Sequence, residues 1–155
     1  GSHKTGFAGV LGVSSKSTTQ ISLALKGATN KAHDFSKLFS EQDVADLSNF
    51  LKFGLVDYGK LVDSKTQKPL RSNVNSGKAI FNICAACHGP EGKNINFGSQ
   101  TEPEYLGTVA EENLWEFLHK VRFGHPGAPM PGMFGILSNN QLQDLLGYAQ
   151  TLPVK

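Results

Sequence analysis

The chain has 155 residues and a formal net charge of +2, enough for one domain of ordinary size or two very small ones. A hydrophobic fraction of 39% supports a packed core, while the charged fraction of 18% lies below the roughly 25% typical of soluble domains. The nearly balanced charge argues against a nucleic-acid partner and against strong electrostatic steering. No apolar run approaches the ~18 residues of a membrane span.

The N-terminal stretch carries weak structural signals. Residues 1–3 are typical of the remnant of a cleaved affinity tag, so we expect the native start, with any leader or membrane anchor, to have been removed. Residues 4–30 mix Gly, Ser and Thr with single apolar residues and show no sustained period. The apolar cluster at residues 21–25 fits either the start of a helix or a short extended segment, and Gly27 ends it.

A clear helix is predicted directly after Ser40. Ser40 is a good N-cap, and Asp43 completes an imperfect capping box. Apolar residues then recur on one helical face, at Val44, Leu47, Phe50 and Leu51. The pattern allows the helix to end at Gly54 or to continue through Tyr58. Residues 62–75 are polar and predict a loop or linker into the second half of the chain.

Three helices are predicted after this linker. The first runs from about residue 76 into Cys84 and ends at the turn sequence of residues 89–92, before a long loop over residues 93–107. Thr108 and Glu111 form a capping box for the second, which carries Leu114, Trp115, Leu118 and Val121 and stops at Gly124. Residues 124–135 are too rich in Gly and Pro for regular structure. Ser138 and Gln141 cap the third, which carries Leu142, Leu145, Leu146, Tyr148 and Ala149.

The most specific motif of the chain is Cys84-x-x-Cys87 followed at once by His88. This pattern is typical of covalent attachment of a c-type haem, in which each thiol adds to one vinyl group of the porphyrin. The adjoining His88 is then placed under the iron as the proximal ligand. Both cysteines of the chain lie in this motif, so no structural disulfide is expected.

Two other uses of paired cysteines fit the sequence poorly. Zinc normally needs four ligands, and none of His33, His119 and His125 has partner spacing. A thioredoxin-like dithiol needs a preceding strand and an α/β pattern, which this sequence lacks.

The order of these features resembles a class I (mono-haem) cytochrome c over about residues 74–152. The resemblance rests on Gly77 and Phe81 in the first helix, the Cys84-x-x-Cys87-His88-Gly89 motif, a long loop, a middle helix, Met130-Pro131 in a Gly/Pro loop, and Tyr148 in the last helix. It implies an all-α, cytochrome c-like helical fold around one covalent haem c, with the first and last helices crossing near Gly77 and Tyr148. It also implies a periplasmic or otherwise extracytoplasmic location, because bacteria attach haem to this motif outside the cytoplasm.

The resemblance further implies a methionine thioether from the Gly/Pro loop as the distal iron ligand. We favour Met130 over Met133, because Pro129 and Pro131 restrict its backbone and because Met133 would leave only a short path to the last helix. Met133 and Pro129 are then expected to line the haem pocket. His125 in the same loop is the main competitor, since imidazole is a good iron ligand.

Apolar side chains of the helices and loops are expected to wall the haem, although the same residues would serve equally as ordinary helix core. These residues are Ile80, Phe81, Phe97, Leu106, Trp115, Phe123, Leu142 and Leu145. Lys78, Lys93, Lys120 and Arg122 could ring an exposed haem edge, but scattered cations are more typical of a solvated surface.

The first half of the chain shows a weaker internal similarity. Residues 35–47 parallel residues 134–145 with one residue inserted, so that Val44 matches Leu142. The first half of the chain contains no Cys-x-x-Cys-His motif and should hold no covalent haem. We expect residues 4–73 to form a helix-containing N-terminal extension, or a degenerate or truncated cytochrome-like segment, and residues 74–155 to form the cytochrome c domain.

The favoured function is one-electron transfer by a carrier that is not itself an enzyme and that shuttles electrons between redox partner proteins. One alternative is an electron-transfer subunit or domain of a larger oxidoreductase, with the N-terminal segment as its docking surface or membrane anchor. The other is a haem sensor or peroxidase-like protein whose distal ligand is labile. Binding of carbon monoxide to the reduced protein would favour the last of these.

Overall fold

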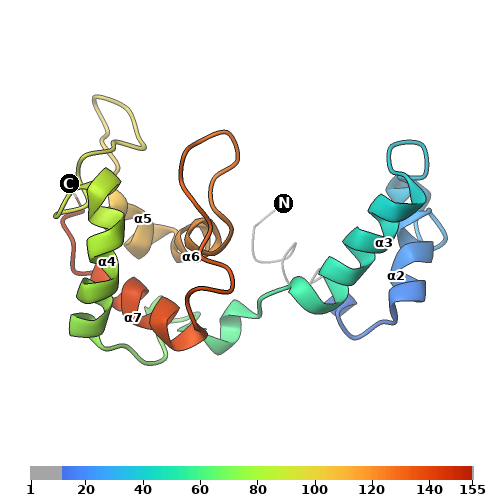
Figure 1. The fold of residues 1–155 in the computed structure, drawn as a ribbon, viewed down its shortest axis with the longest axis horizontal. Helices are drawn as coiled ribbons and strands as arrows, with labels where there is room; N and C mark the ends of the chain where they lie inside the picture. Colours follow the sequence, from blue (N-terminus) through green and yellow to red (C-terminus); the bar gives the residue numbers. More distant parts are fainter. Residues whose placement is uncertain (1–11, 155) are drawn as a thin grey trace. The chain divides into compact units, whose positions relative to one another are not determined.

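The computed structural model describes residues 12–154, which are mostly helical and divide into two compact units at Asp57 and Tyr58 (Figure 1). The all-α expectation is therefore confirmed. Within the described residues, no helix has the length and apolar character needed to span a membrane.

The N-terminal unit is built from two short helices that pack on each other, α2 (Thr18–Leu25) and α3 (Glu41–Asn49). The apolar cluster at residues 21–25 is thus helical, with Ile21 buried. Gly27 ends α2 in the left-handed backbone region at φ +79°, where glycine is strain-free. A 3₁₀ turn (Lys31–His33) lies between the helices, and an ion pair of 2.6 Å joins Lys26 to Glu41.

Helix α3 begins as the capping pattern predicts. The Ser40 hydroxyl accepts from the Asp43 amide at 3.2 Å, and the Asp43 carboxylate accepts in return from the Ser40 amide at 2.9 Å. After α3 the backbone continues as one π-helical turn (Phe50–Gly54), so helical structure ends at Gly54 and does not run on to Tyr58.

The second unit begins with a segment that we call the hairpin segment, residues 58–73. It contains a 3₁₀ turn (Tyr58–Lys60) and a short antiparallel hairpin of β1 (Val62–Asp63) and β2 (Lys68–Pro69). The prediction of a loop over residues 62–75 holds for residues 64–67 and 70–73, which are turns, bends or irregular, but it missed the two short strands and the start of α4 at Val74. Two-residue strands are too short to show a period, and the fold of this segment depends on α7, to which it is tied.

Long-range hydrogen bonds hold the hairpin segment on the last helix. The Gln143 side chain, itself buried, donates to the Leu61 carbonyl at 2.7 Å, and that of Gln150 donates to the Gln67 carbonyl at 2.8 Å. Leu61 and Val62 are buried. The structural unit consequently starts well before residue 74, which is where α4 begins.

Four helices complete this unit: α4 (Val74–His88), α5 (Leu106–Glu112), α6 (Leu114–Phe123) and α7 (Asn139–Ala149). The capping box of Ser138 and Gln141 forms at the start of α7 as predicted. The Thr108–Glu111 box does not start a helix. Thr108 lies within α5, where its hydroxyl accepts from the Tyr105 amide and donates to the Val154 carbonyl.

The middle helix is divided in two at Asn113. The Asn113 side chain accepts from the Glu116 amide and so caps α6, which then ends at Gly124 as expected.

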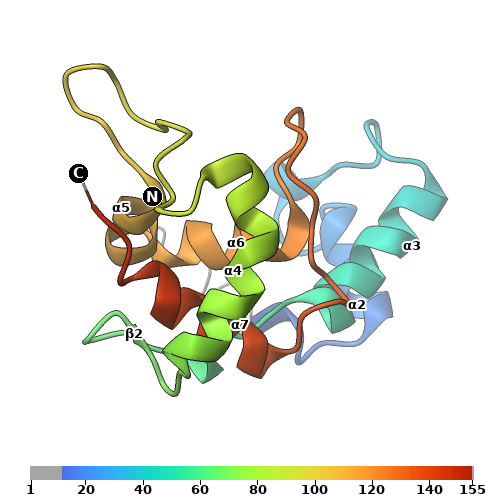
Figure 2. The same cartoon turned by 60° about the vertical axis from the view of Figure 1, so that its left-hand side comes forward.

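Helices α4 and α7 cross in direct contact at Gly77, as the resemblance implied (Figures 1 and 2). A Cβ at Gly77 would overlap the Asp144 carbonyl and lie 2.8 Å from the Tyr148 Cβ. The rings of Phe81 and Tyr148 pack beside this crossing with centroids 5.3 Å apart. The largest fully buried side chains of this unit are Phe81, Leu114, Leu118, Leu142, Leu145 and Leu146.

Candidate haem site

The Cys-x-x-Cys-His motif forms the last turn of α4. Cys84, Cys87 and His88 are spaced i, i+3 and i+4, so their side chains emerge from neighbouring positions on the helix surface. Gly89 ends the helix at φ +77°, and a Cβ there would collide with the Asn94 side chain. The Asn94 amide donates to the His88 carbonyl at 3.0 Å, so a backbone hydrogen bond connects the following loop to the motif.

The environment of the motif favours the neutral imidazole that a metal requires. His88 is half-buried, and burial lowers its pKa below the ordinary value of 6.5. Its Nδ1 atom is buried and has no hydrogen-bond partner among the described residues. Both cysteines are free thiols, and burial raises the pKa of Cys84, with a smaller contribution from Cys87.

Residues 124–137, which we call the Met loop, leave α6 and return to it, so that both arms of the loop contact the last turn of that helix. A Cβ at Gly124 would lie 2.7 Å from the Met130 carbonyl oxygen, and one at Gly132 would lie 2.7 Å from the Phe123 carbonyl carbon. The Met133 amide also donates to the Val121 carbonyl at 2.9 Å. In Figures 1 and 2 this loop stands alongside the C-terminal half of α4.

The three candidates for the distal ligand differ in their surroundings. Met130 and Met133 are half-buried, whereas His125 is exposed. The His125 amide donates to the Met130 carbonyl at 3.3 Å, so Met130 lies where the loop returns to its base. Pro129, expected to line the pocket, is exposed beside it.

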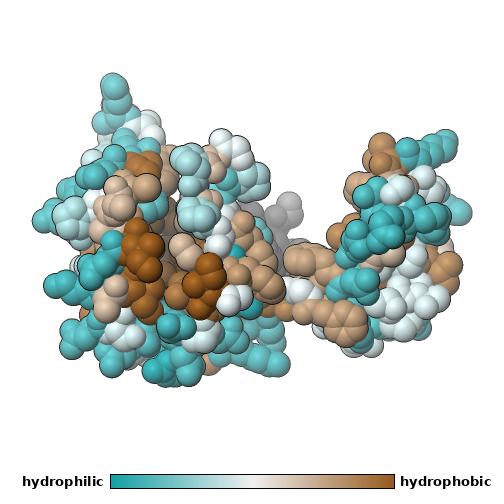
Figure 3. All heavy atoms as spheres, viewed as in Figure 1, coloured by the Kyte–Doolittle hydropathy of each residue, from teal (hydrophilic) through white to brown (hydrophobic). Residues whose placement is uncertain are grey.

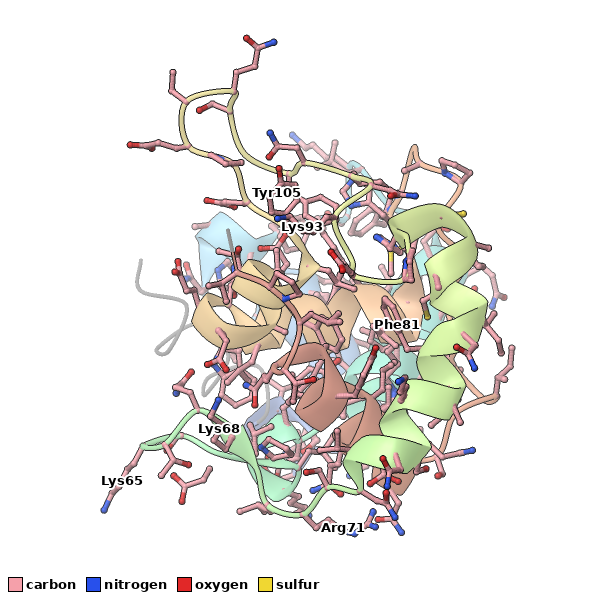
Figure 4. The ribbon with its side chains drawn as sticks, turned by 90° about the vertical axis from the view of Figure 1, so that its left-hand side faces the viewer. Lys65, Lys68, Arg71, Phe81, Lys93 and Tyr105 are labelled. Carbon is pink, nitrogen blue, oxygen red and sulfur yellow. The ribbon has the colours of Figure 1, made fainter. Side chains whose placement is uncertain are left out.

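The expected wall residues fall into three groups. Phe81, Leu106, Leu142 and Leu145 are buried core, and Phe81 points from α4 toward α7 (Figure 4). Ile80, Trp115 and Phe123 are half-buried. Phe97 is 43% exposed but lies directly at the motif, with its ring centroid 6.0 Å from that of His88.

Apolar surface is left exposed on the segments beside the motif. Phe134 and Ile136 of the Met loop are 57% and 69% exposed, and apolar atoms gather over α4 and the segment before α7 in Figure 3. A flat apolar cofactor is a ligand that would cover surface of this kind. Together with two thiols, a neutral imidazole and thioethers, these residues fit a c-type haem.

The four surface cations do not form a ring of free charges. Lys93 lies over the ring of Tyr105 at 5.0 Å (Figure 4), and Lys120 pairs with Glu116 at 2.5 Å. Lys78 is exposed. Arg122 is half-buried: its Nε atom is buried, whereas its Nη1 donates to the Asn139 side chain at the surface.

Sequence reasoning also missed one residue of this region. Tyr58 is buried, and its ring lies 6.0 Å from that of Trp115. Nothing in the local pattern around Tyr58 indicates this pairing, since the two residues lie far apart in the chain.

Alternative uses of the cysteines find no support in the geometry. Among residues 12–154, no group of three or more His, Cys, Asp and Glu side chains is placed to hold a metal ion, so the ligands that zinc needs are not gathered there. The only paired strands of the described chain, β1 and β2, lie far before Cys84 and supply no thioredoxin-like context.

A protein-family comparison matches the family described as Cytochrome c to residues 74–153. No curated protein and no solved structure matches the chain. The match covers half of the chain and contains the whole motif, so the chain belongs to the cytochrome c family. Membership implies haem binding and haem-based electron transfer.

Proposed function

We propose that this protein is a one-electron carrier with a single haem c, attached through Cys84 and Cys87 and ligated by His88 and Met130. The proposal is carried by the half-buried, neutral imidazole of His88 on the same helical turn as both thiols. When bound, the haem supplies an iron that accepts and releases one electron. Ligation by His and Met raises the reduction potential relative to two nitrogen ligands, which suits a carrier.

The protein would contribute a fixed arrangement of ligands. Gly124 and Gly132 allow the Met loop to close tightly on α6, which limits the positions open to Met130. If His88 and Met130 both bound the iron, the iron would have no position open to a substrate. The chain would then act by exchanging electrons with redox partners outside the cytoplasm.

The attachment is tested by producing the protein in cells with a c-type haem attachment system. We expect the mass of one haem to remain on the denatured chain, and to be lost when Cys84 and Cys87 are both replaced by Ala. If the denatured Cys84→Ala/Cys87→Ala variant still carried the mass of one haem, the proposed thioether linkage would be contradicted.

The distal ligand is tested with a matched pair of variants. Met130→Ala should abolish the far-red absorption band of a Met–ferric haem and let the reduced protein bind carbon monoxide, whereas Met133→Ala should retain the band. Loss of the band in Met133→Ala alone would assign Met133 instead. Ready carbon monoxide binding by the unaltered protein would favour a sensor or peroxidase-like function.

A role as a subunit of a larger oxidoreductase is the second candidate, and one observation favours it. The N-terminal unit leaves large apolar side chains exposed, with Leu38 at 76% and Phe53 at 75%. Surfaces of this kind commonly mark protein–protein contacts. Native mass spectrometry of the protein from its source would distinguish the two: a stable complex supports the subunit role, and a lone monomer supports the carrier.

A further inference from the structure

A phenylalanine of the loop that follows the motif contacts the imidazole of His88. The ring centroids of Phe97 and His88 are 6.0 Å apart with an interplanar angle of 45°, which is within the range of aromatic pairs. His88 is half-buried, whereas Phe97 is 43% exposed. The Phe97 ring therefore has one part against the imidazole and another part in water, so it separates the imidazole from the solvent on that side.

Hydrogen bonds across the loop fix the backbone of Phe97. Its amide donates to the Glu104 carbonyl at 2.8 Å. The side-chain oxygen of the preceding residue, Asn96, accepts from the Gly98 amide at 2.9 Å and from the Glu104 amide at 3.0 Å. The side-chain nitrogen of Asn96 donates to the Ser99 carbonyl at 2.9 Å. Asn96 thus connects the two arms of the loop on either side of Phe97.

No regular element supports this part of the chain. Residues 89–105 contain neither helix nor strand, and the loop projects from the rest of the unit in Figure 2. Its base is closed by the Asn94 amide, which donates to the His88 carbonyl, and by the Leu106 amide, which donates to the Gly92 carbonyl at 3.2 Å. Between these ends, the position of the phenyl ring depends on the hydrogen bonds of the Asn96 side chain.

The surroundings of an iron ligand affect the equilibrium between the two oxidation states. Ferric iron carries one more positive charge than ferrous iron, and water stabilises the more highly charged state. An apolar group that keeps water from a ligand therefore favours the ferrous state and raises the reduction potential. A phenyl ring carries no charge and donates no hydrogen bond, so exclusion of water is the effect it offers at His88.

We propose that Phe97 shields His88 from water and thereby raises the reduction potential of the iron, and that Asn96 is a positioning residue that holds Phe97 in place. This inference rests on the proposed function, because it requires that His88 bind the haem iron. Phe97 then acts on the iron ligand itself and is more than a wall residue of the haem pocket.

The test compares the full-length haem protein with Asn96→Ala, Phe97→Ala and the double variant. Both side chains are exposed, so no buried side chain is removed. Phe97→Leu is the conservative variant, because it keeps an apolar cover. The matched control is Thr101→Ala in the same loop, where an exposed hydroxyl lies 3.1 Å from that of Ser99.

Two properties are measured. The first is the midpoint potential. The second is the nuclear Overhauser effect between the rings of Phe97 and His88 in the reduced protein, which is diamagnetic when both axial positions are filled. The second measurement reports whether the two rings are in contact and does not depend on electron transfer.

We expect Phe97→Ala to shift the equilibrium about threefold toward the ferric state, which for a one-electron couple lowers the midpoint potential by about 28 mV. Asn96→Ala should lower the potential in the same direction and weaken the ring contact. The double variant should match Phe97→Ala, because Asn96 acts through that ring. Phe97→Leu should shift the potential less than Phe97→Ala, and Thr101→Ala should leave both measurements unchanged.

Three results would overturn the inference. An unchanged potential in Phe97→Ala would show that the ring does not act on the iron. An equal fall in Phe97→Leu and Phe97→Ala would show that apolar cover is not the cause. Additive shifts in the double variant would show that Asn96 does not act through Phe97.

The outcome separates this inference from the proposed function. If the unaltered protein carries no covalent haem, the proposed function fails and the inference fails with it. If haem is attached and the far-red band of Met ligation is present, but Phe97→Ala has the potential of the unaltered protein, only the inference fails.

Discussion

The crossing of α4 and α7 at Gly77 allows a quantitative prediction, because two effects of Gly77→Ala oppose each other there. In an exposed helix, the change would stabilise the protein by about 1 kcal/mol through helix propensity. At this crossing the added Cβ would overlap the Asp144 carbonyl and approach the Tyr148 Cβ to 2.8 Å. One neighbour is backbone, so the strain cannot be relieved by a rotamer change.

Overpacking of this kind costs up to about 3 kcal/mol, so we expect a net loss of about 2 kcal/mol in the free energy of unfolding. With a urea dependence of about 1 kcal/mol per molar, the unfolding midpoint should fall by about 2 M. The assay is urea unfolding of the haem protein followed by far-ultraviolet circular dichroism. Lys78→Ala, at the exposed neighbouring position, is the control and should change the free energy by less than about 0.5 kcal/mol. A Gly77→Ala protein as stable as the unaltered one would refute the close approach of the two helices.

Two further predictions concern the hairpin segment and the motif. A chain beginning at Tyr58 should have a free energy of unfolding several kcal/mol larger than a chain beginning at residue 74, and therefore a higher urea midpoint. The shorter chain loses the buried side chains of Leu61 and Val62 and the Gln143 hydrogen bond. Equal midpoints would mean that the hairpin segment does not stabilise the domain. In the haem-free protein, burial lowers the pKa of His88, so the unfolded chain binds more protons than the folded chain as the pH falls. The free energy of unfolding, measured by urea unfolding, should therefore decrease below about pH 6.5. This decrease should be smaller in His88→Gln, and an equal decrease in that variant would assign the effect to other groups.

Local signals predicted the parts of the fold that depend on neighbouring residues. The capping boxes at Ser40 and Ser138 formed because a hydroxyl and a partner three residues later complete the cap on their own. The crossing of α4 and α7 at Gly77 was predicted instead from the family resemblance, and the structure confirms it. The internal similarity between the two halves and the role of each haem residue stay predictions.

The capping signal at Thr108 failed because two helix registers compete there. Thr108 and Glu111 match a capping box, but the Thr108 hydroxyl is engaged by Tyr105 and by the Val154 carbonyl near the C-terminus. Asn113, which caps α6, also has a glutamate three residues on, at Glu116. A choice between two acceptable caps is made by tertiary contacts, which a local pattern does not contain.

The hairpin segment shows why a family match and a folded unit differ in extent. Residues 58–73 lie before the match at residues 74–153, yet α7 within that match carries a buried Gln143 whose hydrogen-bond acceptor is the Leu61 carbonyl. A buried amide without such an acceptor would cost about 1–3 kcal/mol, so this position makes sense only with the segment in place. The same segment positions Tyr58 against Trp115 of the matched domain. The haem domain of this chain is therefore better defined by these contacts than by its motif-bearing sequence, and its stability should depend on residues that precede that sequence.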